Sequence, residues 1–303
     1  MSSLTEAAAP RAVRPLSAVA VATMLLLCLS WGFNQVAVKL ALPDIPPLTQ
    51  AAARSIGALV VVLIGVHVRG LVIIKRDGTL PAGILLGVLF ALEFVMINIG
   101  LTLTTATRAI IFLYTSPFFV ALGATTFLGE RLSSRQWLGM ALSFLGVVAA
   151  IGIPQAEVNA RVMFGDLMLV GGAIFWAATT LVFKATRLAK APAEKAMAYQ
   201  LAVSALLLAL FSLLAGETMN HMPGPVALAA FAYQTVWVVG CTFLIWYVLM
   251  QSYQASKLSA FTFITPLFGV AAGHFVLNEL LSAGFAVAIV LVIAGLVLVN
   301  RRG

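Results

Sequence analysis

The stretch that decides the fold occurs twice. Residues 115–133 are TSPFFVALGATTFLGERLS, and residues 264–282 are ITPLFGVAAGHFVLNELLS. The positions that recur at one constant offset are Pro117 and Pro266, Glu130 and Glu279, Arg108 and Lys257, Leu132 and Leu281, Ser133 and Ser282, and Gly146 and Gly295. One offset kept over about forty positions is hard to obtain by chance, so the chain is predicted to contain a repeated unit.

A second pair of matches lies nearer the start of each unit. Trp31 is followed eight residues later by Lys39, and Trp176 is followed eight residues later by Lys184. The repeat therefore extends over both halves of the chain.

The composition places both copies in a membrane. Of 303 residues, 62% are hydrophobic and 9% are charged, with a mean hydropathy of +1.08. Soluble domains carry about 25% charged residues, so a soluble enzyme, a nucleic-acid-binding protein and a disordered scaffold are excluded. The net charge of +8 does not indicate nucleic acid, because most basic residues lie in short gaps between apolar runs, as in membrane loops.

Ten apolar segments approach the roughly 20 residues that a spanning helix needs. They are Leu16–Leu40, Pro47–Val68, Leu80–Ile99, Thr105–Phe127, Trp137–Ile153, Phe164–Phe183, Met197–Leu214, Val226–Met250, Leu258–Leu277 and Ala283–Val299. The domain organisation expected from them is a tail over residues 1–15, a first repeat over 16–153 and a second over 164–300. The gaps leave no room for a domain outside the membrane.

The charge pattern predicts the orientation. Ten spans place both termini on one side, and with that side inside the cell nearly all basic loop residues fall inside, as is usual for membrane proteins. Lys39, Arg161 and Arg108 fall on the outer side. Five spans per repeat is an odd number, so the second copy must enter the membrane from the opposite side. The predicted fold is an all-α membrane protein with ten transmembrane helices in two inverted five-helix repeats, typical of alternating-access transporters.

The repeat also carries a resemblance to a known family. With the two stretches quoted above, residues 30–41, SWGFNQVAVKLA, resemble two tandem EamA domains of the drug/metabolite transporter superfamily. Within it the chain resembles the YddG-type bacterial aromatic amino acid exporters. The resemblance implies an inner-membrane exporter of amino acids and related small metabolites, with cytoplasmic termini. A small-molecule substrate and the lipid bilayer are its expected partners; no nucleic acid and no obligate protein partner are expected, and fusion of the halves favours a monomer.

Three ionisable residues, Arg54, Glu93 and Arg108, lie inside the spans of the first repeat. An isolated charge at a helix centre costs about 2.5–3.5 kcal/mol on the insertion scale, so their similar depth predicts that Glu93 pairs with Arg54 or Arg108. The other cation is then available to a substrate carboxylate, and Glu93 to an ammonium or a coupling proton. The alternative is a structural ion pair, with the arginines extending to the outer headgroups.

Trp31 and Trp176 lie near the middle of equivalent spans, away from the interfaces where membrane tryptophans usually occur. With Asn34 and Thr180 one turn further on, they are predicted to be aromatic and polar walls of a substrate cavity. Close packing between the halves is the alternative. The further substrate-binding candidates are Asn98, Tyr114, Trp246 and Phe263. His274 is a candidate for charge pairing or proton coupling.

Pro117 and Pro266 interrupt equivalent spans and are candidates for hinges, since a proline within a helix removes a backbone hydrogen bond and kinks it. Glu130 and Glu279 end the same spans and are interpreted as capping residues.

The sequence has no phosphate-binding Gly-rich loop with lysine, no His/Cys metal cluster and no catalytic triad order. No cofactor, metal or enzymatic activity is expected. ATP-driven transport is therefore not expected, and the energy is predicted to come from a gradient of substrate (uniport) or of protons (proton antiport). The alternatives are a carrier of this fold for small polar amino acids, purines, nucleotide sugars or cationic drugs, an intramembrane transferase, and a channel.

Overall fold

The structure is a computed structural model that describes residues 16–73, 75–152, 159–278 and 280–301. Over these residues the regular elements are all helical. Nine helices within them are long and apolar enough to cross a membrane, and Phe285–Asn300 is a shorter apolar helix. The prediction of an all-α membrane protein is confirmed.

The elements follow one another in two similar series. The first contains α1 (Ala18–Ala41), α2 (Pro47–Val68), α3 (Leu80–Leu103), α4 (Ala106–Leu113), α5 (Ser116–Phe127) and α6 (Ser134–Ile151). The second contains α7 (Ala160–Ala185), η1 (Arg187–Lys190), α8 (Ala193–Leu214), α9 (Pro225–Ala232), η2 (Tyr233–Thr242), α10 (Phe243–Ser252), α11 (Ala255–Phe261), η3 (Thr262–Ile264), α12 (Thr265–Leu277) and α13 (Phe285–Asn300).

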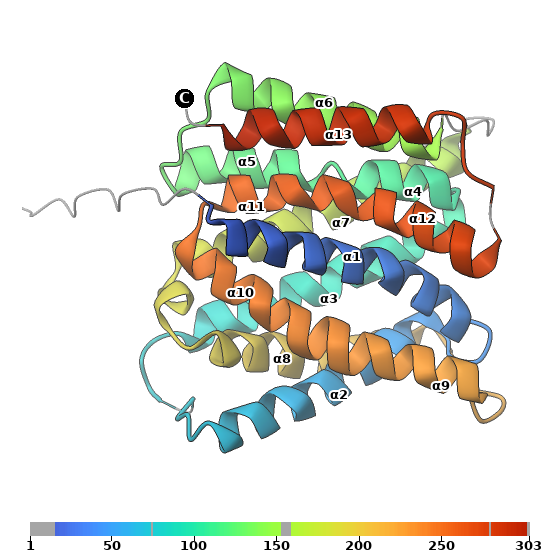
Figure 1. Cartoon of the computed structure of the whole chain (residues 1–303). Helices are drawn as coiled ribbons and strands as arrows, with labels where there is room; N and C mark the ends of the chain where they lie inside the picture. The colour runs from blue at the N-terminus through green and yellow to red at the C-terminus, as the bar shows by residue number, and fades with distance from the viewer. Residues whose placement is uncertain (1–15, 74, 153–158, 279, 302–303) are drawn as a thin grey trace, which may run out of the picture.

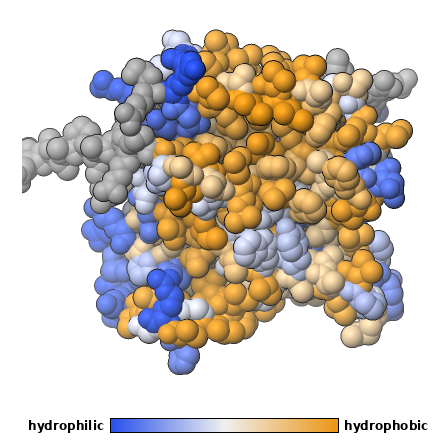
Figure 2. Space-filling model, in the orientation of Figure 1, coloured by the Kyte–Doolittle hydropathy of each residue, from blue (hydrophilic) through white to orange (hydrophobic). Residues whose placement is uncertain are grey.

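The helices run back and forth between two ends of the molecule (Figure 1). We call the end at which α1 begins the N-side end, and the end at which α1 finishes the far end. The helix α13 finishes at the N-side end, on the left of Figure 1. Much of the visible surface between the ends is apolar, and hydrophilic residues gather mainly at the ends (Figure 2). A belt of this kind fits a protein surrounded by hydrocarbon.

The two spans that contain the repeated prolines are interrupted, for a local reason. The expected single span Thr105–Phe127 consists of α4 and α5, which meet at Tyr114 and Thr115. Pro117 lies in the first turn of α5, and Pro266 lies in the first turn of α12, after the short 3₁₀ helix η3. Proline suits a first turn because its missing N–H has no intrahelical partner there.

Small residues bring the last helix of each series together. A Cβ atom at Gly295 of α13 would collide with the Ser143 Oγ and the Gly139 carbonyl oxygen of α6. Only glycine fits here, so α6 and α13 pack backbone against backbone, as membrane helices with small residues do.

Polar contacts tie the elements together at the N-side end. Asp77, in the loop after α2, forms an ion pair of 2.7 Å with Lys195 at the start of α8. The hydrogen bonds from Lys195 and Thr79 hold the pKa of the Asp77 carboxyl well below its usual range. Glu130, after α5, accepts hydrogen bonds from the backbone N–H groups of Ala255 and Ser256 at the start of α11, at 2.7 and 3.1 Å. The interpretation of Glu130 as a capping residue is confirmed; its repeat partner Glu279 lies outside the described residues.

Candidate substrate cavity

A cavity of about 260 Å³ lies between the two series of helices. Each helix that lines it contributes one face, with residues spaced three or four apart. The α3 face consists of Phe90, Glu93, Phe94, Ile97, Asn98 and Leu101, and the α1 face consists of Trp31, Asn34, Gln35 and Val38. The remaining walls come from α2, α7, α8, the end of α4 and the η2–α10 segment.

Trp31 is at the centre of an aromatic wall. Its ring lies edge-to-face against Trp246, with centroids 5.7 Å apart, and against Phe243 at 6.1 Å. The indole N–H of Trp31 donates to the Thr242 hydroxyl at 2.9 Å, which satisfies the polar atom of an otherwise apolar ring. Thr242 occupies the repeat position of Glu93, so equivalent positions have a carboxyl group in one half and a hydroxyl in the other.

Trp176 lines the same cavity from α7. Its ring lies edge-to-face against Tyr114, with centroids 6.0 Å apart. Thr180, also on α7, adds a polar group. The structure therefore brings together both tryptophans and the polar residues expected beside them.

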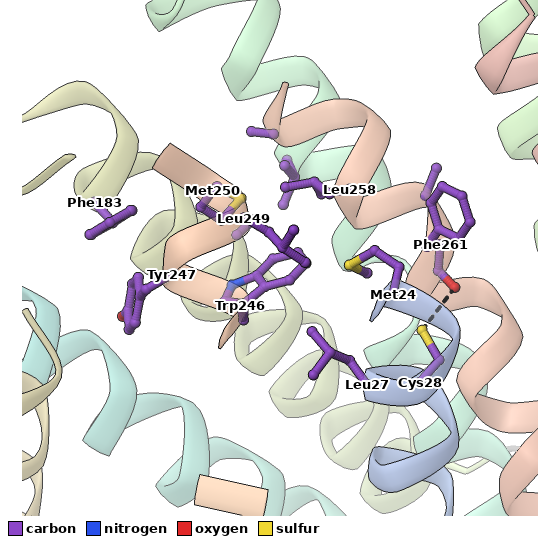
Figure 3. Packing of buried hydrophobic residues seen from close by; sticks show 14 of the residues in the cluster. Met24, Leu27, Cys28, Phe183, Trp246, Tyr247, Leu249, Met250, Leu258 and Phe261 are labelled. Carbon is purple, nitrogen blue, oxygen red and sulfur yellow. Dashed lines mark hydrogen bonds between the residues drawn. The ribbon is translucent and has the colours of Figure 1, made fainter. Parts of the chain in front are cut away.

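Tyr247 and Gln200 form the polar part of the wall near Trp246. The phenol of Tyr247 donates a hydrogen bond to the Gln200 side-chain carbonyl, and its ring packs on Phe183 at 4.3 Å between centroids. In Figure 3, Trp246 lies between Tyr247 and Leu27 of α1. Beyond them, Phe183 and Met250 belong to the apolar cluster that fills the interior.

Arg54 projects from α2 into the cavity lining with part of its guanidinium unpartnered. The residue is 5% exposed, and its Nε and Nη2 atoms have no hydrogen-bond partner in the described part of the chain. The guanidinium carbon lies 4.7 Å from the centroid of the Phe94 ring, a cation–π contact. Glu93, next to Phe94 on α3, is 9% exposed and lines the same cavity. The two residues attract each other electrostatically but form no ion pair in the described structure.

Arg108 is paired with a carboxylate that was not predicted from the sequence. It forms an ion pair with Asp166 of α7, and its Nε lies 3.0 Å from the Asp166 Oδ1. Thr104 donates a further hydrogen bond of 3.0 Å to the same carboxylate. Of the two alternatives predicted for Glu93, pairing with Arg108 does not occur in this structure, because Asp166, nearly two turns into α7, neutralises Arg108.

Two further predicted residues lie away from the cavity. Phe263 is buried in an aromatic cluster with Phe118 and Phe144, at centroid distances of 5.7 and 6.3 Å. His274 lies in the last turn of α12, beside the Phe275 ring, and is not part of the cavity lining. Asn98 does line the cavity, although its side-chain amide donates back to the Phe94 carbonyl oxygen.

Several lining residues were missed from the sequence. They are Gln35, Gln50, Phe90, Phe94, Thr179, Gln200 and Phe243. The signal for most of them was helical spacing from residues already chosen: Gln50 lies one turn before Arg54, and Phe90 and Phe94 lie beside Glu93. Among the described residues, no group of three His, Cys, Asp or Glu side chains could hold a metal ion.

Comparison with known proteins assigns the chain to a family. The model of the EamA-like transporter family matches residues 18–152 and 163–301. The chain belongs to the EamA-like transporter family. Its two EamA segments make it a multi-pass membrane transporter.

Curated relatives in this family are similar over most of their length. The chain is 24% identical over 278 residues to the uncharacterized transporter YoaV of Bacillus subtilis, covering 88% of this chain and 92% of YoaV. It is 28% identical over 296 residues to the probable amino-acid metabolite efflux pump of Escherichia coli, covering 90% and 91%. A crystal structure superposes with a TM-score of 0.80 at 19% identity over 91% of this chain and 94% of the other, which shows that the two chains share a fold.

Proposed function

We propose that this EamA-family transporter exports amino acids, with aromatic ones favoured, and related small metabolites across the bacterial inner membrane. It works by alternating access between two inverted five-helix halves, as a uniporter or a proton antiporter. The observation that carries the proposal is the cavity lining, in which aromatic walls surround a few buried polar and charged groups. Such a lining suits small molecules with one apolar and one charged part.

Two relatives support export of amino acids. The proteins of Escherichia coli and Salmonella typhimurium, 28% and 27% identical to this chain, are each named a probable amino-acid metabolite efflux pump. The preference for aromatic substrates rests on the rings of Trp31, Trp176 and Trp246 around the cavity.

The helix contacts support an inverted repeat. The packing of α3 on α7 has its counterpart in α1 against α9 and η2, and the packing of α5 on α7 has its counterpart in α12 on α1. Two further contacts join helices that are equivalent in the two repeats: α2 packs on α8, and α6 packs on α13. Exchanging the halves leaves each of these two pairs unchanged. The exchange therefore returns each of these pairings.

Repeat-related positions near the two ends differ in burial, which supports alternating access. Val38 and Leu101 line the cavity toward the far end. Their counterparts, Phe183 and Met250, are 0% exposed within the apolar cluster. Lys184 donates to the backbone carbonyls of Met250 and Tyr253 on that closed side. In the proposed orientation, with cytoplasmic termini, this conformation is open outward and closed inward.

Counterflow in proteoliposomes tests the function. Vesicles loaded with unlabelled phenylalanine are expected to accumulate labelled phenylalanine transiently and saturably, with competition by tryptophan. A pH step across the membrane then separates proton antiport from uniport. Folded protein that shows no counterflow with phenylalanine contradicts the aromatic preference, and the same vesicles then test threonine, purines and cationic drugs.

A further inference from the structure

Arg54 lines the cavity with buried N–H donors that have no hydrogen-bond partner in the described structure. A guanidinium offers five N–H donors, and burying donors without partners costs free energy. The donors without a partner among the described residues are the Nε and Nη2 atoms, and Arg54 is 5% exposed. The Phe94 ring stabilises the positive charge from one face but accepts no conventional hydrogen bond. The edge of the guanidinium therefore requires an acceptor from a ligand or from water.

A carboxylate fits this edge better than any neutral group. Its two oxygens match the fork of guanidinium donors, and the resulting charge-assisted bonds are about twice as strong as neutral ones. Asp166 is not available for this, because it is bonded to Arg108 and Thr104. Arg54 is therefore the cation in the cavity that the described carboxylates leave without an ion pair.

The complementary acceptors lie on neighbouring faces. Glu93 of α3 lines the cavity next to Phe94, the ring that Arg54 contacts. The Asn34 Oδ1 atom of α1 is buried and also has no hydrogen-bond partner in the described structure. The Glu93 carboxyl group and the Asn34 Oδ1 atom both accept hydrogen bonds, and a Glu93 carboxylate also attracts a positive charge. A ligand that carries a carboxylate and an ammonium on the same carbon atom satisfies both sides at once and adds no net charge to the cavity.

We propose that Arg54 and Glu93 form a zwitterion clamp, in which Arg54 binds the α-carboxylate of the substrate and Glu93 binds its α-ammonium. The inference rests on the proposed function and narrows it to free α-amino acids. The aromatic rings around Trp31 contact the side chain, and the clamp selects the backbone. Amines lack the carboxylate, carboxylic acids lack the ammonium, and dipeptides hold the two charges further apart. All three classes are therefore expected to bind more weakly than free α-amino acids.

The test measures equilibrium binding of three ligands to purified full-length protein in nanodiscs. Phenylalanine carries both charged groups, phenethylamine lacks the carboxylate, and phenylpropionate lacks the ammonium. Wild-type protein is expected to bind phenylalanine at least about tenfold more tightly than either analogue, since a hydrogen bond to a charged group changes affinity by about that factor.

Two neutral variants separate the roles of the two charges. Arg54→Gln is expected to weaken phenylalanine and phenylpropionate at least about tenfold while leaving phenethylamine unchanged. Glu93→Gln is expected to weaken phenylalanine and phenethylamine while leaving phenylpropionate unchanged. Arg69→Gln removes an exposed cation, paired with the buried Glu194 at the N-side end and absent from the cavity lining. It is the control and should change none of the three. The ratio between ligands does not depend on the fraction of protein that is folded.

Three results overturn the clamp. They are equal affinity of the wild type for phenylalanine and phenethylamine, equal affinity for phenylalanine and phenylpropionate, and loss of all three ligands in equal proportion in both variants. Phenylalanine counterflow combined with any of them leaves the proposed function standing and rejects the clamp alone. If phenylalanine does not bind, the same comparison is made with threonine, the amine that lacks its carboxylate and the acid that lacks its ammonium. If Arg54→Gln then weakens only the ligands with a carboxylate and Glu93→Gln only those with an ammonium, the clamp is retained without the aromatic preference. Any other result rejects the clamp and the aromatic preference together.

Discussion

Trp31 makes two separable contributions to the cavity: a ring face and a hydrogen bond. Replacing it with alanine removes the edge-to-face contacts with Trp246 and Phe243 and leaves the buried Thr242 hydroxyl without its indole donor. Aromatic pairs contribute about 0.5–1.5 kcal/mol beyond the area they bury. We expect Trp31→Ala to raise the KM for phenylalanine about three- to tenfold, measured as initial uptake in proteoliposomes.

The neighbouring Phe33 provides the control for Trp31. It lies on the same helix, is 41% exposed and is not part of the cavity lining. Phe33→Ala should leave the KM unchanged. Equal effects of the two alanine variants would mean that Trp31 acts through the packing of α1 and not through the substrate.

Arg108 and Asp166 are expected to affect stability and not selectivity. Removing either partner leaves a charge in a site where both side chains are mostly buried, and hydrogen bonds to charged groups contribute about 1.5–3 kcal/mol. Arg108→Gln and Asp166→Asn should each lower the thermal unfolding temperature, and the double variant should lose less than the sum of the two. The order of affinity among phenylalanine and its two analogues should stay as in the wild type; a changed order would place Arg108 in substrate binding.

Individual residues were predictable where the repeat or the charge made them unusual. Trp31 and Trp176 were found because they occupy equivalent positions within spans, and Arg54 and Glu93 because charges there are costly. Asp166 was missed because it lies close to a helix end, where a carboxylate needs no special explanation from sequence. Phe263, a predicted substrate contact, lies in an aromatic core cluster; a phenylalanine in an apolar helix has the same sequence pattern whether it faces a cavity or a core.

At the scale of elements, Glu130 joins α5 to α11 across the repeat boundary. It accepts the two backbone N–H groups that begin α11 and a hydrogen bond from the Ser256 hydroxyl. Loss of a side-chain cap costs about 0.5–2 kcal/mol, and a carboxylate at a helix start gains further from the helix dipole. We expect Glu130→Ala to lower the free energy of unfolding by about 1–2 kcal/mol.

The adjacent Arg131 separates this effect from a general loss of charge. Its side chain is exposed, so Arg131→Ala should leave the unfolding transition within experimental error. Denaturant titration followed by tryptophan fluorescence measures both variants. Equal stability of Glu130→Ala and the wild type would show that α11 does not depend on this cap.

Helix positions were predictable, and the interruptions within helices less so. Apolar length placed α1, α2 and α3 within a few residues, since a span must be about 20 residues long. The π-helical segment η2 within the eighth span, which packs against α1 and α2, had no signal in the sequence. The break between α4 and α5 was indicated by Pro117, but the proline alone does not distinguish a kink from two separate helices.

For the whole molecule, the sequence predicted the number of apolar segments and the repeat, whereas the conformation could not be predicted. Val38 and Phe183 occupy repeat-related positions and are both apolar, yet one lines the cavity and the other is fully buried. In the proposed alternating access one sequence serves both conformations. Which end is closed is then a property of the populated state, and only structure or labelling reports it.

Cysteine labelling tests this alternation across the molecule. In a background with Cys28→Ala and Cys241→Ser, a single Leu101→Cys is expected to react rapidly with a membrane-impermeant maleimide added to the outside of right-side-out vesicles, because Leu101 is 44% exposed and lines the cavity. Met250→Cys, at the repeat-related position, should react slowly from either side, since Met250 is fully buried. A ligand shifts an equilibrium only by binding one state more tightly. An inhibitor that holds the inward-open state should therefore slow labelling of Leu101→Cys and speed labelling of Met250→Cys from the cytoplasmic side. Rates that change in the same direction at both positions would indicate local loosening and would rule out an exchange of the open end between the halves.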